Sequence, residues 1–321
     1  MKVYQRLAMA CLTLAALLSI AHIVWTGVHN DMAPAVLPPA GEALQGSAPY
    51  TFAVMGDSRD NNSVFESILA GAQRDGARFI IHTGDLVGRG TKNQFEWLLG
   101  ELQEVNLSVP FCAVPGNHDL TLGPNRRLVY ERAFGPRQYW FSYGDALFVA
   151  FDDSDGKCSP EDLQWLDSTL ARLRPQYGLC FVFTHIPPRD PRPNGAHDLS
   201  EDAANALMAV LTKHTVTALF AGHIHTYLED TVDGIPVYIS GGAGATRDEP
   251  IVPYHYLLCT VNGKGSYQIR KVDVPDVTNT DYAEYVYWVK YPVEKSLAVS
   301  VLFLLAGMAF VWLSYRQPGP H

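Results

Sequence analysis

Five apolar runs in this sequence are each followed by side chains of the kind that bind divalent metal ions. These side chains belong to Asp57, Asp85, Asn117, His185, His223 and His225. A glycine precedes all of them except His185 and His225, and a glycine lets the backbone turn sharply so that the next side chain points into a shared crevice. In an α/β sheet, the loops that follow the strands converge at one edge. We therefore expect the five loops to build one metal site.

The residue types indicate both the metals and the reaction. Carboxylate, amide and imidazole ligands suit Mn, Fe, Zn or Co, and the absence of thiolates from the set argues against a structural zinc cage. Two divalent ions about 3.5 to 4 Å apart can hold the attacking and leaving oxygens of an in-line displacement, with a carboxylate as bridge. The pattern therefore predicts two divalent metal ions and hydrolysis of a phosphoester.

The elements that must position these residues alternate between short apolar runs and amphipathic stretches, which is typical of an α/β sandwich. Strands are predicted at 50–55, 78–83, 110–115, 139–143, 146–152, 179–185, 216–222, 231–240 and 255–261. Helices are predicted at 65–74, at 93–103, from Ser159 onward and at 202–213. Ser159 and Pro160 fit a helix start, and the Asp-Gly pair at 233–234 predicts a hairpin turn.

Both ends of the chain are apolar, unlike the middle. Residues 7–25 and 297–315 contain no Asp, Glu, Lys or Arg, and each run is long enough to cross a bilayer as a helix. We divide the sequence into an N-terminal membrane anchor or signal segment (1–27), a linker (28–49), a catalytic domain (50–273), a connector (274–295), a C-terminal transmembrane helix (296–316) and a tail (317–321). Cleavage after Ala33-Pro34-Ala35 is the alternative for the first segment.

The charges that flank the two apolar runs predict an orientation. Lys2 and Arg6 precede the first run, and such charges hold the N-terminus in the cytoplasm. The second span would then return Arg316 to the cytoplasm. We expect a protein of the cytoplasmic membrane with two spans and a periplasmic or extracellular catalytic domain.

The composition argues against a nucleic-acid partner, and the positions of the cysteines argue against thiol chemistry. The formal net charge is −9 and there is no run of Lys or Arg, so a nucleic-acid partner is not expected. Metal ions can still supply the positive charge that a phosphoester needs. Cys112, Cys180 and Cys259 lie inside strand-like apolar runs and are predicted to be free core thiols.

The order of the polar blocks is specific as a set. Gly-Asp at 56–57, Gly-Asp at 84–85, Gly-Asn-His-Asp at 116–119, His185 and Gly-His-Ile-His at 222–225 follow one another along the chain. This set resembles the calcineurin-like metallophosphoesterase superfamily over residues 50–271. The resemblance implies a four-layer α/β/β/α sandwich of two mixed sheets, with a dinuclear metal site at the strand ends.

The resemblance also implies how the ligands divide between the two ions. A first half of the centre would consist of Asp57, Asp85 and His225. A second half would consist of Asp85, Asn117, His185 and His223. Asp85 would belong to both halves and bridge the two ions.

Two residues beside the ligands would take part in the reaction. His118 would act as a general acid at the leaving oxygen, or stabilise transition-state charge, with Asp119 orienting it. A hydroxide activated by the metal ions would be the nucleophile. His197, Arg189 and Arg192 lie in the Pro-rich loop after His185, which is positioned to form the rim of the site. We interpret them as parts of a solvated loop, and a role at the rim is the alternative.

One position departs from the family pattern. Many members carry Asp-x-His in the first block, but here Asp57-Ser58 is followed by Arg59, and a permanently charged guanidinium cannot bind a metal. Either Asp60 or Asn61 substitutes as a ligand, or the first half has fewer protein ligands and more water. Arg59 would either hold a substrate phosphate oxygen, as a catalytic residue, or form a salt bridge.

These observations predict a membrane-anchored phosphoesterase. The substrate would be a phosphomonoester or phosphodiester, and a lipid or cell-envelope precursor is expected because two spans would hold the site near the bilayer. The alternative is a membrane-tethered binding or regulatory module with reduced or no turnover, which the departure at Arg59 suggests.

Overall fold

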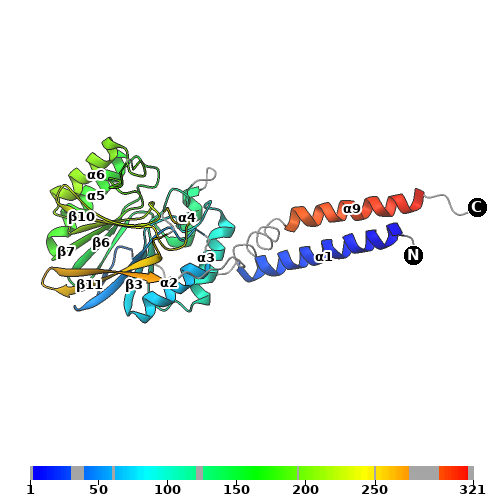
Figure 1. The fold of residues 1–321 in the computed structure, drawn as a ribbon, viewed down its shortest axis with the longest axis horizontal. Helices are drawn as coiled ribbons and strands as arrows, with labels where there is room; N and C mark the ends of the chain where they lie inside the picture. The colour runs from blue at the N-terminus through cyan, green and yellow to red at the C-terminus, as the bar shows by residue number, and fades with distance from the viewer. Residues whose placement is uncertain are drawn as a thin grey trace, which may run out of the picture. The chain divides into compact units, whose positions relative to one another are not determined.

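The computed structural model describes residues 3–29, 40–59, 62–120, 126–193, 195–248, 251–274 and 296–316. The chain forms two units, one of Ala33–Val277 and one that joins Met1–Met32 to Thr278–His321. The larger unit contains both sheets and their helices, and the smaller unit contains helices α1 and α9 (Figure 1).

The larger unit is built on two mixed sheets. The seven-stranded sheet has the order β1-β5-β6-β7-β8-β10-β9, and the five-stranded sheet has the order β12-β11-β2-β3-β4. The strands of the first sheet are β1 (Ala43–Leu44), β5 (Tyr139–Tyr143), β6 (Ala146–Ala150), β7 (Leu179–Phe183), β8 (Ala218–Ala221), β9 (Tyr227–Val232) and β10 (Ile235–Ser240). Those of the second are β2 (Tyr50–Met55), β3 (Ala77–His82), β4 (Phe111–Ala113), β11 (Tyr254–Gly263) and β12 (Ser266–Val274). Within these sheets β2, β3 and β4 pair in parallel, as do β6, β7 and β8.

Aromatic side chains fill the space between the two sheets. Phe52 of β2 stacks on Phe79 of β3, with 5.4 Å between ring centroids, and meets Phe148 of β6 edge-on at 5.1 Å. Alternate side chains of β2 point to opposite faces of the sheet, so Ala53 and Met55 belong to the core on the helical side of the same sheet. Strand β2 is therefore buried on both faces, which explains its continuous apolar sequence.

Helices cover the outer face of each sheet (Figure 1). Helices α2 (Asn62–Arg74), α3 (Lys92–Glu104) and α4 (Arg126–Phe134) pack on the five-stranded sheet. Helices α5 (Pro160–Leu173) and α6 (Glu201–Lys213) pack on the seven-stranded sheet, and a short 3-10 turn, Arg174–Gln176, follows α5. Two helical layers thus enclose two mixed sheets, and the predicted α/β class is confirmed.

Local sequence signals account for several element boundaries. The Ser159 side chain accepts a hydrogen bond from the backbone N–H of Asp162 and caps α5, as its position predicts. The run predicted as one strand at 231–240 contains the end of β9 and the whole of β10, and the predicted Asp-Gly turn joins the two strands as a hairpin. Cys112, Cys180 and Cys259 are free and buried, as predicted.

The two-residue strand β1, which pairs with β5, lies inside the predicted linker 28–49, and two longer elements were not predicted either. Helix α4 has charged residues between its apolar ones and no strong apolar face, and its buried side chains are Tyr130, Ala133 and Phe134. Strand β12 lies at the edge of its sheet, and most of its side chains are half-buried or exposed. Both escape a search for apolar periodicity because neither buries a continuous apolar face.

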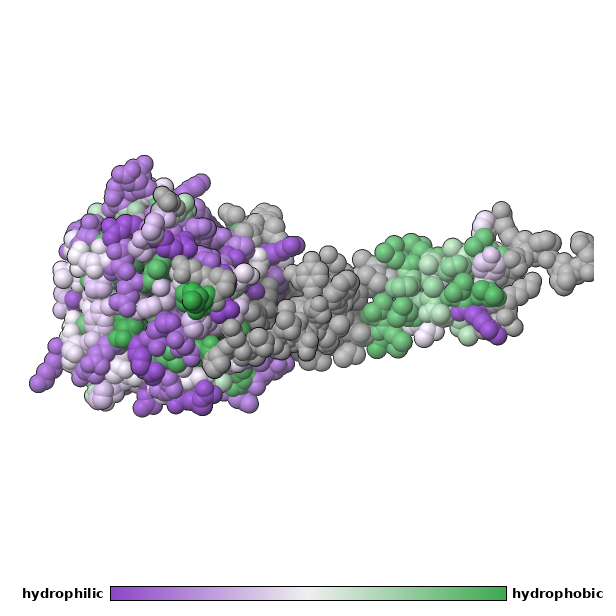
Figure 2. Space-filling view, in the orientation of Figure 1, coloured by the Kyte–Doolittle hydropathy of each residue, from purple (hydrophilic) through white to green (hydrophobic). Residues whose placement is uncertain are grey.

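The smaller unit consists of α1 (Val3–His29) and α9 (Ser296–Arg316). Among the described residues, one helical stretch, Val3–Ile20 of α1, is long and apolar enough to cross a membrane, and α9 contributes a shorter apolar stretch, Ser300–Leu313. Figure 2 shows hydrophobic side chains over this helix pair and mostly hydrophilic ones on the visible face of the larger unit. The second span and the orientation stay predictions.

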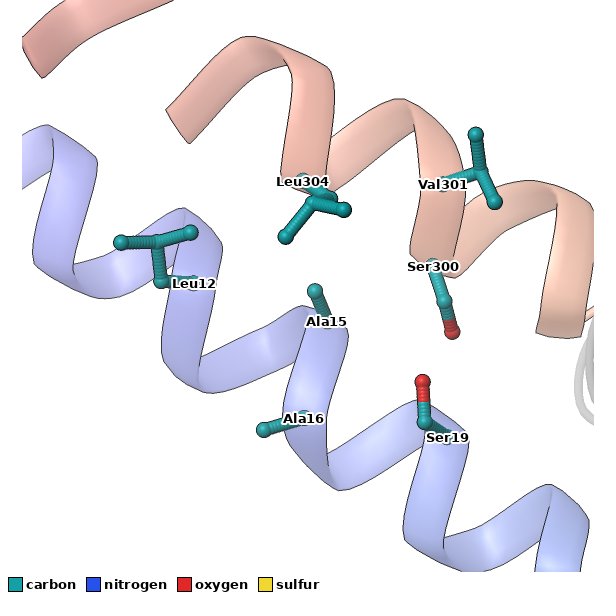
Figure 3. Close-up of a pocket in the computed structure, with 7 residues that line it drawn as sticks. All are labelled: Leu12, Ala15, Ala16, Ser19, Ser300, Val301 and Leu304. Atoms are coloured by element: carbon teal, nitrogen blue, oxygen red, sulfur yellow. The ribbon is translucent and has the colours of Figure 1, made fainter. Parts of the chain in front are cut away.

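The two helices pack through small residues. Ala8 and Ala15 of α1 are buried in the pair, and a Cβ on Gly307 of α9 would lie 2.9 Å from the Leu12 side chain. The Ser19 and Ser300 side chains point toward each other across a small gap (Figure 3). Small residues let helices approach closely, which is how helices associate within a bilayer.

Candidate metal centre

The predicted ligands come from the carboxyl ends of strands in both sheets. Asp57, Asp85 and Asn117 follow β2, β3 and β4 of the five-stranded sheet. His185 follows β7 of the seven-stranded sheet, and His223 and His225 follow β8. Backbone hydrogen bonds join the loops within each sheet, from the Asp57 N–H to the Gly84 carbonyl at 3.0 Å and from the Gly222 N–H to the His185 carbonyl at 2.9 Å. The centre therefore forms where the two sheets end side by side.

Three of the six ligands have an unusual backbone conformation. Asp57, Asp85 and His223 have φ angles of 62°, 55° and 68°. This left-handed region is sparsely populated by residues other than glycine and concentrates at functional sites, where the surrounding structure holds the strain. We infer that these strained turns direct the Asp57, Asp85 and His223 side chains into the centre.

The glycines before the ligands are needed for close approach. A Cβ on Gly84 would lie 2.7 Å from His185 Nδ1, and one on Gly116 would collide with the Asp85 backbone and carboxylate. A Cβ on Gly222 would lie 2.6 Å from Asp57 Oδ2. The loops thus pass so near one another that a side chain at these glycines would displace a ligand.

The second half of the centre is a tight cluster around one ring nitrogen. His185 Nε2 lies 2.9 Å from Asn117 Oδ1, 3.2 Å from His223 Nδ1 and 3.4 Å from Asp85 Oδ1. The other ring nitrogen of His185, Nδ1, lies 2.8 Å from the carbonyl oxygen of Thr83, which fixes the ring. Four different donor atoms converge here, as a metal site requires.

The first half is looser and has unpaired atoms. Asp57 Oδ2 accepts a hydrogen bond from the His223 backbone N–H at 2.8 Å, but Asp57 Oδ1 has no hydrogen-bond partner. His225 Nε2, 3.5 Å from Asp57 Oδ1, is also buried and without a hydrogen bond, while His225 Nδ1 lies 2.7 Å from the Thr246 carbonyl oxygen. Buried polar atoms are normally paired because leaving one unpaired costs about 1–3 kcal/mol. A cation between these two atoms would satisfy both.

Three donors of the centre also satisfy a direct geometric test. Asp57, Asp85 and His185 are buried, and one possible ligand atom from each lies within 4.8 Å of the others. Together with the unpaired atoms of the first half, this spacing shows that the residues present fit a divalent metal centre.

Arg59 contacts the centre directly. Its Nε and Nη2 donate hydrogen bonds of 2.9 and 2.6 Å to Asp85 Oδ2, and its backbone N–H donates to the Asp85 carbonyl oxygen at 3.2 Å. Of the two roles left open by the sequence, the salt bridge is the one present in this structure. Asp60, the other residue suggested for the first half, lies outside the described residues together with Asn61.

The charges of the centre favour a bound cation. Burial alone would raise the pKa of Asp85, but His185 and Arg59 outweigh it and bring the pKa down to about 2. Burial and the nearby His185 lower the pKa of His223 to about 3, so this ring is neutral near pH 7. The centre thus holds an ionised Asp85 carboxylate beside a neutral His223 imidazole, which are the protonation states that metal ligands need. Burial would lower the pKa of His185 and of His225, but nearby carboxylates outweigh it and raise both pKa values, so metal binding competes with protonation of these two rings.

His118 and Asp119 lie at the rim and floor of the centre. The His118 backbone N–H donates to Asp85 Oδ1 at 2.8 Å, and His118 Nδ1 lies 2.9 Å from the Gly88 carbonyl oxygen. The buried Asp119 carboxylate instead accepts hydrogen bonds from the backbone N–H groups of Leu86, Val87 and Gly116. Its geometry differs from the predicted contact with the His118 ring, because three backbone donors already surround it.

Sequence reasoning missed Asp153. This buried carboxylate accepts hydrogen bonds from the backbone N–H groups of His185, at 2.8 Å, and Ile186, at 3.1 and 3.2 Å. Burial raises the pKa of Asp153 to about 6, against the lowering effect of His185 and the backbone donors. A signal existed, because Asp153 follows the apolar run of β6 as the ligands follow theirs.

The Pro-rich loop after His185 is more ordered than a solvated loop. The Asp190 carboxylate accepts from the Arg192 guanidinium and, at 3.3 Å, from the His197 backbone N–H. Arg192 also donates to Asp248 at 2.6 Å. The His197 ring lies 5.8 Å from the His223 ring, between centroids, so this loop forms part of the rim of the centre. His197 is exposed, as interpreted, whereas Arg192 is half-buried because its guanidinium pairs with Asp190 and Asp248.

Fold and site together define a class of α/β proteins with a candidate metal centre at the ends of two facing sheets. A sequence model described as calcineurin-like phosphoesterase matches residues 50–227, which is more than half of the chain. The chain therefore belongs to the calcineurin-like phosphoesterase family, and by family it is a phosphoric ester hydrolase. Members of this family use a dinuclear centre of divalent metal ions.

Named relatives include both phosphatases and phosphodiesterases. The chain is 28% identical over 221 residues to the human serine/threonine-protein phosphatase CPPED1, covering 59% of this chain and 70% of the relative. It is 24% identical over 270 residues to a probable cyclic nucleotide phosphodiesterase of Psychrobacter sp. (strain PRwf-1), covering 76% of each.

Solved structures show the same fold. A purple acid phosphatase, PPD1, from yellow lupin superposes with a TM-score of 0.60 at 15% identity over 72% of this chain, which spans about half (52%) of the lupin chain. A dimetal phosphatase from Danio rerio gives a TM-score of 0.53 at 14% identity, covering 70% of this chain and 99% of that one. At these identities the likeness concerns the fold alone.

Proposed function

We propose that this chain is a metal-dependent phosphoesterase that hydrolyses a phosphomonoester or phosphodiester, anchored in the cytoplasmic membrane with its catalytic domain outside the cytoplasm. The observation that carries the catalytic part is the pair of buried atoms without a hydrogen bond, Asp57 Oδ1 and His225 Nε2, beside the cluster around His185. Without a cation, each of these two atoms has, among the described residues, only the other, 3.5 Å away, as a partner.

The residues divide into metal ligands and groups that act on the substrate. Two divalent ions of Mn, Fe, Zn or Co would be held by Asp57, Asp85, Asn117, His185, His223 and His225. Such ions activate water and stabilise the charge of the transition state. His118, at the rim, would donate a proton to the leaving oxygen. Asp119 would hold the loop that carries Asn117 and His118.

Metal content and turnover test this proposal together. Full-length protein in detergent micelles would be freed of metal, reloaded with Mn²⁺ and assayed with p-nitrophenyl phosphate and its bis-ester. We expect turnover of at least one ester that requires the ion and is lost in Asn117→Ala. Wild-type protein that binds Mn²⁺ but turns over neither ester, with Asn117→Ala behaving the same, would contradict the proposal.

The two assay substrates also separate the two kinds of ester. The phosphatase and phosphodiesterase names of the relatives leave both open, and the acidic chain makes a nucleic acid an unexpected substrate. Lipid-linked or envelope-linked phosphoesters are the natural substrates we propose, since a tethered site samples the bilayer surface.

The membrane part of the proposal rests on the helix pair. The apolar α1 carries Leu17 and Ile20 more than half exposed, and α9 carries Leu302 and Trp312 likewise, so the pair presents an apolar surface that a bilayer would cover. Reporter fusions after Gln45 and after His321 test the orientation. We expect the first outside and the second inside the cytoplasm, and a cytoplasmic reporter after Gln45 would overturn it.

A binding module without turnover is the second candidate, and one observation favours it. Arg59 donates twice to Asp85, the carboxylate that the family pattern gives to both ions. Were this ion pair to exclude metal altogether, the fold would remain and hydrolysis would not. Metal analysis of the purified protein separates the candidates, because a module of this kind would bind no ion in the centre.

A further inference from the structure

Each oxygen of the Asp85 carboxylate has its own set of partners. Oδ1 faces the second half of the centre, where it accepts from the His118 backbone N–H and lies 3.4 Å from His185 Nε2. Oδ2 accepts both hydrogen bonds from Arg59, at 2.9 and 2.6 Å. The guanidinium therefore takes one oxygen of the predicted bridge and leaves the other to the second half.

The backbone holds Arg59 in this place. Arg59 has a φ of 39°, and its own N–H donates to the Asp85 carbonyl, so the two residues are joined through main chain and side chain alike. The Asp85 side chain is fully buried and that of Arg59 is 24% exposed. An ion pair with one buried member is much less screened than a surface pair, and its geometry gives it the strength of a charge-assisted bond.

The first half of the centre depends on the same oxygen. Asp57 Oδ1 and His225 Nε2 are its two unpaired donors, and among the described residues Asp85 is the only further predicted ligand of this half. An ion with two protein ligands is held weakly, so a share of Asp85 matters more here than in the second half, which also has Asn117 and two imidazoles. A guanidinium stays charged at any accessible pH, so Arg59 cannot release Asp85 to a metal ion by losing a proton.

We propose that Arg59 is a built-in cation that competes with the first-half ion for Asp85, so that the centre binds its two ions in unequal steps. The second half binds an ion tightly, and the first half binds one weakly because that ion must displace the guanidinium. The inference rests on the proposed metal centre and adds a control on how fully it is loaded. Available metal, rather than protein, then sets how many molecules carry both ions.

Titration of full-length, metal-free protein in detergent with Mn²⁺ tests this inference without an activity assay. Free Mn²⁺, followed by its electron paramagnetic resonance signal, gives the number of ions bound and both dissociation constants. For wild type we expect two steps, with the second at least about tenfold weaker. Arg59→Gln, which removes the charge, should tighten the second step by about tenfold or more and leave the first nearly unchanged.

Three further variants separate charge from shape. Arg59→His places an imidazole at the Asp-x-His position and should give the tightest second step. Arg59→Lys keeps the charge, loses the fork and should fall between wild type and Arg59→Gln. Arg270→Gln is the matched control, because Arg270 also donates to a carboxylate, that of Asp75 at 3.2 Å, but contacts no residue of the centre. It should bind Mn²⁺ as wild type does.

The outcomes distinguish this inference from the proposed function. Two equally tight steps in wild type, unchanged in Arg59→Gln and Arg59→His, would overturn the role of Arg59 and leave the metal centre standing. Binding of no Mn²⁺ by wild type or by Arg59→Gln would overturn the proposed function itself. Should Arg59→Gln fail to fold, the comparison of wild type with Arg59→Lys decides, because competition predicts a tighter second step in the lysine variant.

Discussion

The two halves of the metal centre are built in different ways. In the second half, His185 Nε2 lies within 3.4 Å of donor atoms from Asn117, His223 and Asp85 before any ion is considered. In the first half, Asp57 Oδ1 and His225 Nε2 lie 3.5 Å apart without hydrogen bonds, and a guanidinium occupies the shared carboxylate. One half is pre-organised by the protein and the other is left to a cation.

The second half contains the ligand that the fold holds most firmly. The ring of His185 is fixed through Nδ1 by the Thr83 carbonyl, and its backbone is fixed by Asp153. Pre-organised ligands lose little entropy on binding, so a half in which four ligand atoms already converge holds an ion more tightly than a half with fewer ligands and a competing guanidinium. The asymmetry predicts that changes in the second half cost more than equivalent changes in the first.

The largest expected effect is loss of a second-half ligand. Asn117→Ala removes the oxygen nearest to His185 Nε2 and should lower kcat for p-nitrophenyl esters by at least about 100-fold, since even residues that only support a ligand cost 10- to 100-fold. His225→Ala, in the first half, should cost less. Both variants would be assayed at saturating Mn²⁺, and the comparison of the halves fails if His225→Ala proves as damaging as Asn117→Ala.

A smaller effect is expected for the carboxylate that supports His185. Asp153→Asn removes the negative charge and one of the two acceptor oxygens, and it places an NH₂ group, which cannot accept, beside a backbone N–H group of this turn. The affinity of the tight ion should fall about 10- to 100-fold while the weaker ion is little affected. Asp155→Asn is the control, because Asp155 is exposed and accepts only from the Lys157 N–H. Equal effects on both ions would show that the two halves are not independent.

The support of the first half should depend on pH. His255 is buried behind the loop that reaches Asp57, its N–H donates to the Gly242 carbonyl, and burial lowers its pKa from 6.5 to about 4. Below about pH 6.5 the unfolded chain takes up a proton that the folded chain refuses until about pH 4. His255 alone should therefore lower the free energy of unfolding by about 3 kcal/mol as the pH falls across this window, and its contribution is fully present above pH 6.5.

Denaturant unfolding of metal-free protein at several pH values measures this loss. His255→Gln removes the titrating group, so its stability should change less over the same window even if it begins lower. An equal slope in wild type and variant would assign the pH dependence to other groups.

Much of the fold and of the ligand set could be predicted from the sequence. Strands buried on both faces give continuous apolar runs, and the polar residue after each run lies at the sheet edge because strands β2 to β4 and β6 to β8 are parallel. Strand β12 escaped because it buries little, and helix α4 escaped because its buried side chains do not form a continuous apolar face. Asp153 was missed although it directly follows the predicted strand at 146–152, which is the position that the ligands hold after their strands.

The partners of individual polar atoms could not be predicted. That Arg59 donates to Asp85, or that Asp119 holds backbone N–H groups and not the His118 ring, depends on loops far apart in sequence meeting within hydrogen-bond distance. The same holds for Arg192, whose guanidinium joins its own loop to Asp248. Sequence periodicity carries no information about such contacts.

The smallest expected effect concerns the loop at the rim of the centre. His197 lies beside His223 on a loop gathered by Asp190, and a partly exposed residue there can contribute about 1 kcal/mol or less to substrate binding. His197→Ala should raise KM by up to about fivefold with little change in kcat or in Mn²⁺ affinity. Arg189→Ala is the control, because this residue of the same loop is paired with Asp230 of β9. If His197→Ala lost Mn²⁺ instead, His197 would support the metal ion itself. The loop would then belong to the second half of the centre together with the ligands that follow the strands.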